Sequence, residues 1–472
     1  MAARSLATRQ PNERLASLIQ EAGCSNAGLA RRVNMCGAEQ GMDLRYDKTS
    51  VARWLRGQQP RGSVPNLIAE ALGRKLGRPV TVDEIGMADG RSLATNIGLQ
   101  FAPTPAATVD VVTELWRSDV NRRDFLLNSS VAVAALVAPS RDWLITEPDA
   151  AVSRVGGPRV GASDVEAVRA TTEMLSVLDH RFGAGHIRPV VVHYLGSVVS
   201  GLLGGTYTDE VGRALFAAVS RLTELAGYMA VDTGQPGLAQ RYYIQALRLA
   251  QAAGDRPYGG YVLAAGMSHL AGSLGNPREI TQLARAAQEG SKSARTGTGA
   301  TATTMAMFHA AEARGHAQLG DVRACESSLA RAETAMEQSR PDEDPVWIAH
   351  FDRAYLADEF AHCYRDLDRP RQAEEAARAA LEGHAETRVR RRAVDTLLLA
   401  TAHLQQNRLD EACAVAGDAL HLVTRLHSAR GEEYLRDFQR RLAPYGAEPA
   451  ARDFMDAVRA SRDGDDEEVI PA

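Results

Sequence analysis

Apolar residues recur three or four positions apart along most of the chain, a spacing typical of amphipathic helices. Near the amino terminus, four short stretches of this kind predict four small helices, each with one buried stripe. Their inward-facing positions are, in chain order, Leu15, Leu18 and Ile19; Leu29, Ala30 and Val33; Val51, Trp54 and Leu55; and Leu67, Ile68, Ala71 and Leu72. β-Branched residues rarely alternate with polar ones over the length of a strand, so the sequence predicts an all-α fold.

Breaks in this pattern divide the chain into domains, since 472 residues are too many for one compact core. The prolines of residues 101–105 favour an extended backbone and mark a boundary. Ser163 and Glu166 have the spacing of a capping box, which predicts that a second large helical domain begins there. The predicted organisation is a small helical domain over residues 1–91, a linker over 92–162 with connecting helices and, over 139–162, a surface loop, then a helical repeat domain over 163–460 and a disordered acidic tail over 461–472.

The large domain contains an internal repeat. Five segments share a turn residue, a small or apolar residue five positions later, and Ala seven positions further on. They are Gly234/Ala239/Ala246, Gly275/Ile280/Ala287, Gly320/Cys325/Ala332, Asp368/Ala373/Ala380 and Asn407/Ala412/Ala419. Gly, Asn and Asp adopt the left-handed backbone that reverses a chain between antiparallel helices, and residues seven apart share a helix face. The repeat predicts stacked helical hairpins, with a plain helical bundle as the alternative.

Charge is distributed unevenly along the chain. The net charge is -5, yet residues 1–91 hold 14 Lys and Arg against 9 Asp and Glu. A basic amino-terminal domain joined to an acidic remainder favours contact with a polyanion through the basic part. The five cysteines, at positions 24, 36, 325, 363 and 413, are scattered without a CxxC pair. They favour a reducing, cytoplasmic location over a disulfide framework or a zinc site.

Two segments of the basic domain carry a more specific signal. Residues 29–34 and 49–57 resemble the positioning and recognition helices of the lambda-repressor-like helix-turn-helix family, the second closed by Gly57. This resemblance implies that the second helix enters the major groove of duplex DNA. The residues predicted to reach the base edges are Lys48, Thr49, Ser50 and Arg53, of which Thr49 and Ser50 could bond either bases or phosphates. The predicted phosphate-contacting residues are Arg31, Arg32, Arg56 and Arg61.

One departure from the family pattern concerns the turn between these two helices. Residues 35–47 put about a dozen positions where the usual turn has three or four. A longer loop would leave the start of the third helix open and would bring Arg45 and Tyr46 towards the DNA backbone. The alternative is a small helical bundle with a basic surface and no role at DNA.

Within the large domain, residues 226–247, 315–321 and 361–367 resemble the tetratricopeptide repeat family, although the turns are 39 to 48 residues apart and the family norm is 34. The resemblance implies a concave surface that holds peptides or protein partners. The combined plan resembles regulators of Gram-positive bacteria, including actinobacterial regulators of development and secondary metabolism.

That plan implies a homodimeric, sequence-specific transcription regulator that binds a palindromic site and is gated by a peptide, a small molecule or a protein partner. The predicted ligand-binding residues are Arg314, Trp347, Arg353 and Tyr355. The repeat domain has few Asn residues, which disfavours a peptide held through its backbone. The alternative function is a protein-interaction scaffold whose head does not bind DNA.

Three other sequence features resemble an export signal, a metal site and a phosphate-binding loop, but none fits that role. Residues 121–138 resemble a twin-arginine export signal, but the apolar run is shorter than the roughly 20 residues that span a bilayer and lies far from the amino terminus. His180, His186 and His193 do not share a helix face, so we expect no metal site. The glycine-rich residues 296–300 lack the ending of a phosphate loop. The sequence predicts no catalysis and no cofactor.

Overall fold

The computed structural model describes residues 11–39, 44–58, 60, 64–78, 80, 82, 84–87, 97–121, 131, 134–147, 149–292, 299–424 and 428–467. The chain divides into two compact units, Met1–Asn96 and Ile97–Ala472, here named the head and the body. Over the described ranges the regular structure is helical, and the β pairing there is limited to two isolated bridges in the body. The predicted all-α fold is therefore confirmed.

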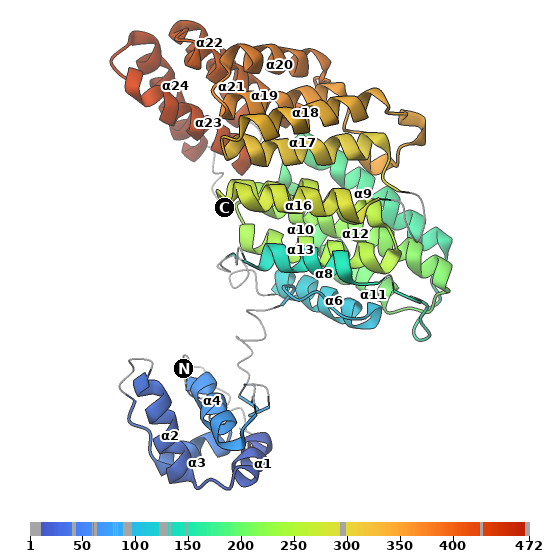
Figure 1. Cartoon of the computed structure of the whole chain (residues 1–472), viewed down its shortest axis with the longest axis vertical. Coiled ribbons are helices and arrows are strands. Elements are labelled where there is room, and N and C mark those ends of the chain that lie inside the picture. Colours follow the sequence, from blue (N-terminus) through green and yellow to red (C-terminus); the bar gives the residue numbers. More distant parts are fainter. Residues whose placement is uncertain are drawn as a thin grey trace. The chain divides into compact units, whose positions relative to one another are not determined.

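The head is a small helical domain (Figure 1). Its helices are α1 (Glu13–Glu21), α2 (Asn26–Glu39), α3 (Lys48–Leu55) and α4 (Val64–Leu76). Each of the four apolar stripes predicted from the sequence packs into one core, in which Leu15, Leu29, Val51 and Ile68 are fully buried. The four predicted helices are confirmed, and each contributes one face to that core.

The connection between α2 and α3 is shorter than the sequence predicts, because it comprises only residues 40–47. Residues 35–39 continue α2 instead of starting a loop. The Asn34 side chain donates to the Tyr46 carbonyl and accepts from the Tyr46 amide, both at 2.9 Å. The Tyr46 ring packs edge-on against Trp54 of α3, with ring centroids 5.1 Å apart. These contacts tie residues 44–47 to both helices and fix where α3 begins; residues 40–43 lie outside the described part of the chain.

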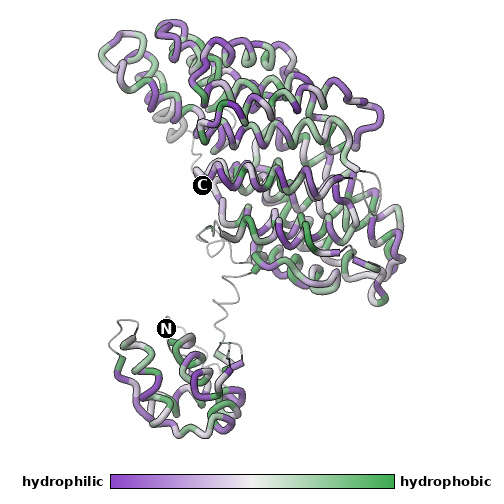
Figure 2. The backbone as a smooth tube through the Cα atoms, in the orientation of Figure 1, coloured by the Kyte–Doolittle hydropathy of each residue, from purple (hydrophilic) through white to green (hydrophobic). Residues whose placement is uncertain are grey.

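The body is a stack of antiparallel helices (Figure 1). Its elements are α6 (Pro105–Asn121), α8 (Ala134–Ile145), α9 (Ala162–Phe182), α10 (Ala184–Tyr194), η1 (Leu195–Val199), α11 (Ser200–Leu203), α12 (Asp209–Asp232), α13 (Pro236–Ala253), α14 (Arg256–Tyr261), η2 (Val262–Met267), α15 (Ser268–Ser273), α16 (Pro277–Gly290), α17 (Ala302–Gln318), α18 (Val322–Glu337), η3 (Pro341–Glu343), η4 (Val346–Ile348), α19 (Arg353–Asp366), α20 (Pro370–Gly383), α21 (Val389–Gln405), α22 (Leu409–Thr424), α23 (Ala429–Leu442), η5 (Ala443–Tyr445) and α24 (Pro449–Glu467). Consecutive helices pack as hairpins, α12 on α13, α17 on α18, α19 on α20 and α21 on α22. Figure 2 shows hydrophilic and hydrophobic residues alternating along the outer helices, as expected of amphipathic helices.

The predicted repeat is borne out by its turns. All five turn residues have a positive φ, between 55° and 72°: Gly234, Gly275, Gly320, Asp368 and Asn407. Asp368 and Asn407 are the non-glycine residues with positive φ among those described. All ten repeat positions on the following helices are at most 3% exposed. The sequence repeat therefore corresponds to helical hairpins joined by left-handed turns, and the body is an α-solenoid.

The helix α12 spans much of the core. By length and composition alone it could cross a membrane, but 67% of its apolar window is buried within the body. Its partner α13 is buried from Gly237 to Ala252. A helix that is apolar on most sides is buried in the core of a protein, and α12 and α13 accordingly form the centre of the body.

Residues 97–162 belong to the body, whereas the sequence predicts a separate linker there. The helix α8 also runs through Pro139, where the sequence analysis placed a surface loop. Leu136 and Trp143, on either side of this proline, are fully buried. The Trp143 ring fits against Gly259 and Gly290, at both of which a Cβ atom would meet it at less than 3 Å. Burial of the tryptophan favours the helix in spite of the proline.

Two helix ends also differ from the sequence prediction. The amino-terminal cap of α9 is not formed by Ser163 and Glu166; instead the Asp164 carboxylate accepts from the Gly161 amide at 2.8 Å. At the other end of the chain, α24 continues to Glu467, into the acidic residues assigned to a disordered tail. Each further residue of a helix whose first turns are packed gains one backbone hydrogen bond, so the helix can run on past its buried part.

The first residues of the body are held by buried polar side chains of α13. Gln245 Nε2 donates to the carbonyls of Gly98 and Gln100, at 2.8 and 2.9 Å. Arg248 Nε donates to the carbonyl of Ala102 at 2.5 Å, and its guanidinium forms two hydrogen bonds with Asp149. These contacts fix the backbone of residues 98–102 to the body.

Candidate nucleic-acid interface and ligand cavity

The start of α3 is fixed by a reciprocal cap. Asp47 Oδ1 accepts from the Ser50 amide at 2.8 Å and from the Ser50 hydroxyl at 2.9 Å. These hydrogen bonds hold the pKa of Asp47 below its ordinary value, so the carboxylate that caps the helix is ionised at neutral pH. The helix closes at Gly57, whose φ is +85°. The sequence Asp47-x-x-Ser50 therefore defines where α3 begins.

The two faces of α3 differ in chemistry. Val51 and Trp54 are buried against the other head helices. The opposite face and part of α2 present exposed polar and basic side chains. These are Lys48, Thr49 and Arg53 of α3, Arg56 directly after it, and Arg31 and Arg32 in the middle of α2. Six of the eight residues predicted to contact DNA are thus exposed on two adjacent helices.

The other two predicted DNA-binding residues differ from this group. Ser50 is 5% exposed, and its hydroxyl contacts Asp47 and accepts from Arg53 Nη2 at 3.2 Å. This corrects the prediction that Ser50 reads bases, since its side chain caps α3 and positions Arg53. Arg61 lies outside the described residues.

Residues 15–88 match the family model of the SP15 N-terminal domain. The match spans most of the head and none of the body. Comparison with curated proteins and with solved structures finds no match.

The body contains a cavity of about 540 Å³, which is lined by residues of α9, α12, α14, η4, α19, α21 and α23. A smaller cavity of about 260 Å³ lies beside it and shares several of its lining residues. The shared residues are Glu224, Tyr228, Tyr261, His350, Tyr355 and Arg430. Arginine and aromatic side chains dominate the larger cavity, a combination suited to planar and anionic molecules.

The four residues predicted to bind a ligand are only partly brought together. Trp347 and Tyr355 line the larger cavity, and Arg314 and Tyr355 line the smaller one. Arg353 is exposed at the first turn of α19 and lines neither. The Trp347 ring packs against Tyr258 and Tyr261, with centroids 5.3 and 5.2 Å apart.

Two arginines of the larger cavity have acidic partners. Arg390 contacts Asp179 at 3.2 Å and Asp232 at 3.3 Å, joining α21 to α9 and α12. Arg391 contacts Asp358 at 2.5 Å and lies over the Tyr355 ring, 4.0 Å from its centroid. Since their charges are matched within the protein, these two arginines hold the cavity walls together.

Arg221 of α12 and Arg430 of α23 differ from that pair. Neither forms an ion pair with an acidic residue in the described parts of the chain. The buried Nε atom of each also lacks a hydrogen-bond partner there, as does that of Arg390. The Arg221 guanidinium lies 5.6 Å from the centroid of the Tyr258 ring. The larger cavity is therefore lined by two arginines that form no ion pair among the described residues.

A carboxyl group also lines both cavities. Burial raises the pKa of Glu224 to about 8, so this carboxyl is mostly protonated at neutral pH. The nearby Tyr243 hydroxyl is fully buried and has no hydrogen-bond partner among the described residues. Sequence reasoning missed Arg221, Glu224 and Arg430. For the first two the available signal was a pair of charged residues in the middle of the apolar helix α12.

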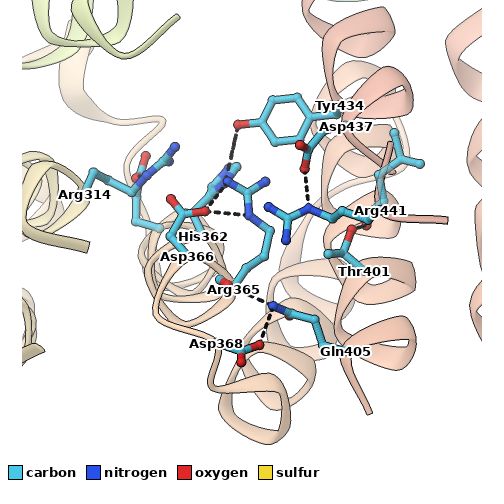
Figure 3. Close-up of polar contacts among 12 residues, drawn as sticks. Arg314, His362, Arg365, Asp366, Asp368, Thr401, Gln405, Tyr434, Asp437 and Arg441 are labelled. Carbon is cyan, nitrogen blue, oxygen red and sulfur yellow. Dashed lines mark hydrogen bonds and ion pairs between the residues drawn. The ribbon is translucent and has the colours of Figure 1, made fainter. Parts of the chain in front are cut away.

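Several polar groups at and beside the smaller cavity are paired with one another (Figure 3). Arg365 contacts Asp366 at 2.6 Å, Arg441 contacts Asp437 at 2.8 Å, and the Tyr434 hydroxyl lies 3.4 Å from the His362 ring nitrogens. Other polar contacts of the same region join Gln405 to Asp368 and Arg314 to Glu359. This side of the cavity has little unmatched charge to offer a ligand.

A π-helical turn shapes the wall of the smaller cavity. The segment η2 contributes Ala264, Ala265 and Gly266 to the lining. A Cβ atom at Gly266 would meet the Tyr243 ring at 2.6 Å, so only glycine lets this wall approach α13. Single π-helical turns inside helices occur frequently at functional sites.

Proposed function

We propose that this protein is a cytoplasmic transcription regulator whose head binds duplex DNA and whose body responds to a ligand or protein partner. The observation that carries the proposal is the exposed face of α3. None of its cations Lys48, Arg53 and Arg56 forms an ion pair with a described acidic residue, while the opposite face anchors the helix in the head core. A surface of unpaired cations on a rigid helix suits a polyanion.

The chemistry of that face divides into two roles. Arg53 can donate two parallel hydrogen bonds to guanine O6 and N7, and its hydrogen bond to Ser50 orients the guanidinium in advance. Arg31, Arg32 and Arg56 would contact phosphates and set the register of the head on the duplex. Two copies of the chain on a palindromic site would double both contributions.

A ligand in the cavity would influence the head through helices α12 and α13 and residues 98–102. The helix α12, which carries Arg221 and Glu224 into the cavity, packs on α13. In turn, α13 holds residues 98–102, the first segment of the body after the head. A ligand that moves α12 would thereby act on the segment from which the chain leads to the head.

Binding of labelled duplex DNA to the full-length protein, followed by fluorescence anisotropy, tests the proposal. We expect log K to fall linearly with log salt concentration, with a slope of about -0.9 for each phosphate contacted. Arg53→Ala should remove discrimination between a selected site and random duplex, by about 1–3 kcal/mol. Arg31→Ala should weaken both sequences equally and make the salt slope shallower by about one unit.

The matched control is Arg459→Ala, which removes an exposed arginine of α24 in the body and should leave DNA binding unchanged. Absence of duplex binding at low salt would overturn the proposal and favour the alternative, a scaffold whose head contacts a protein. That alternative rests on the same exposed face of α3.

A further inference from the structure

We propose that the larger cavity of the body binds a small planar molecule that carries an oxyanion, a carboxylate or a phosphate, held by Arg221 and Arg430. This inference deepens the proposed function, because it names the class of ligand to which the body would respond. It assigns the cavity to a molecule recognised by charge and by stacking together.

The charge of the cavity supports an anionic ligand. Arg390 and Arg391 are matched by Asp179, Asp232 and Asp358, whereas Arg221 and Arg430 have no described acidic partner. A guanidinium withdrawn from water without a counter-ion is unfavourable, and a carboxylate or phosphate matches its planar fork. An oxyanion would therefore give an ion pair to the two arginines that form none with the described residues.

The acidic residues of the cavity do not compensate these cations. The Glu224 carboxyl is mostly neutral at neutral pH, because burial raises its pKa to about 8. In that form it donates a hydrogen bond and can bind an oxyanion alongside the arginines. Glu173, the other acidic residue of the lining, is exposed to solvent.

The aromatic residues of the same cavity support a planar ligand. Tyr258, Tyr261 and Trp347 pack against one another, and the rings of Tyr228 and Tyr355 lie under Arg390 and Arg391. Rings and guanidinium planes of this kind stack on flat molecules. The volume of about 540 Å³ falls within the range of roughly 300–1,000 Å³ that small-molecule sites have.

A pair of fluorescent probes separates charge from stacking. Anilinonaphthalene sulfonate carries an oxyanion on fused rings, and N-phenylnaphthylamine has the same rings without the charge. We expect the full-length protein to bind the sulfonate about tenfold or more tightly than the neutral amine, since hydrogen bonds to charged groups differ from neutral contacts by at least this factor. Equal affinity for the two probes, or no binding of the sulfonate, would overturn the proposal.

Variants test whether the two arginines are responsible. R221Q and R430Q should each weaken sulfonate binding about tenfold and leave the affinity for the neutral probe unchanged. The controls R213Q on α12 and R436Q on α23 remove arginines of the same helices that line neither cavity, and both should bind as the parent does. Unchanged sulfonate affinity in R221Q and R430Q overturns the assignment.

Two further measurements complete the test. If a glutamine variant fails to fold by circular dichroism, R221K and R430K retain the charge without the planar fork and should show a smaller loss of affinity. Displacement of the sulfonate by phenyl phosphate or by benzoate, but not by phenol, identifies the preferred oxyanion, and equal displacement by phenol contradicts the proposal. Because DNA is absent throughout, failure here is distinct from failure of the head to bind duplex.

Discussion

The arginines of the head and those of the body have different surroundings. Arg53 on α3 is exposed and contacts Ser50 of its own helix, whereas Arg390 on α21 is 7% exposed and contacts Asp179 and Asp232 on two other helices. Water screens a surface cation, so it can remain without a partner until a polyanion arrives. A buried cation needs a fixed counter-charge, and it then links the helices that supply the charge. In the proposed function the exposed arginines of the head serve recognition, whereas Arg390 holds helices of the body together.

The largest effect is expected where a buried pair is broken. Arg390→Met leaves Asp179 and Asp232 buried without their cation, which should lower the free energy of unfolding by about 3–5 kcal/mol. Urea unfolding of the full-length chain, followed by circular dichroism, measures the loss. Adding Asp179→Asn should recover part of it. A variant as stable as the parent would show that Arg390 does not join these helices.

A second effect should depend on pH. Burial would raise the pKa of Glu312, but hydrogen bonds from Gln288 and Arg285 and the charge of Arg331 lower it to about 2, against an ordinary value of 4.5. A carboxyl group whose pKa is lower in the folded state than in the unfolded state stabilises the fold at pH values above its unfolded pKa. This stabilisation is lost as the pH falls towards the folded pKa. Because both arginines are about half exposed, the contribution is at most about 3 kcal/mol, present above pH 4.5 and lost towards pH 2.

The comparison with Glu312→Gln isolates this contribution. Unfolding midpoints in urea, measured at intervals from pH 7 to the lowest pH at which both proteins fold, should converge below pH 4.5. Parallel curves for the parent and the variant over that interval would contradict the assignment of the pH dependence to Glu312.

A smaller effect is expected at the cap of α3. Asp47→Ala removes the carboxylate that binds the Ser50 amide and should destabilise the head by about 1 kcal/mol. Amide hydrogen exchange of α3 in the full-length protein measures the change, whereas tryptophan fluorescence would also report Trp116, Trp143 and Trp347 of the body. Asp47→Asn keeps an acceptor and should cost much less. If Ala and Asn cost the same, the side chain at position 47 does not cap the helix.

The smallest effects should come from exposed arginines of either unit. Arg56→Ala in the head and Arg378→Ala in the body, which pairs with Glu374 on the surface of α20, should each change stability by less than about 1 kcal/mol. Thermal unfolding of both variants checks this. If Arg378→Ala lowered the stability as much as Arg390→Met, burial of an arginine would not decide how much it contributes to the free energy of unfolding.

Local features of both units could be predicted from the sequence. The buried stripes of the four head helices and the positive φ of Asp368 and Asn407 follow from residue type and spacing over a few positions. The exposure of Arg53 follows from its place opposite Val51 on α3. Such features are set by neighbours within one or two helical turns, which a single sequence displays directly.

Other features depend on residues distant in sequence and could not be predicted. Arg390 meets Asp179 across 211 positions, and no periodic pattern relates the two. Arg353 was expected beside Tyr355 at a ligand site, but successive residues of a helix point in different directions, and only Tyr355 faces the cavity. The buried hydroxyl of Ser50 is an intermediate case. The spacing of Asp47 and Ser50 is visible in the sequence, but it does not decide whether Ser50 caps α3 or reads bases.

The last helix of the chain closes the end of the body. Ala451, Phe454 and Val458 of α24 pack against the final hairpins, and Phe454 meets Phe438 edge-on with centroids 5.4 Å apart. A stack of repeats without such a lid would present an apolar end on which another copy could continue the stack indefinitely. By packing on the final hairpins, α24 covers this apolar surface with side chains of the same chain.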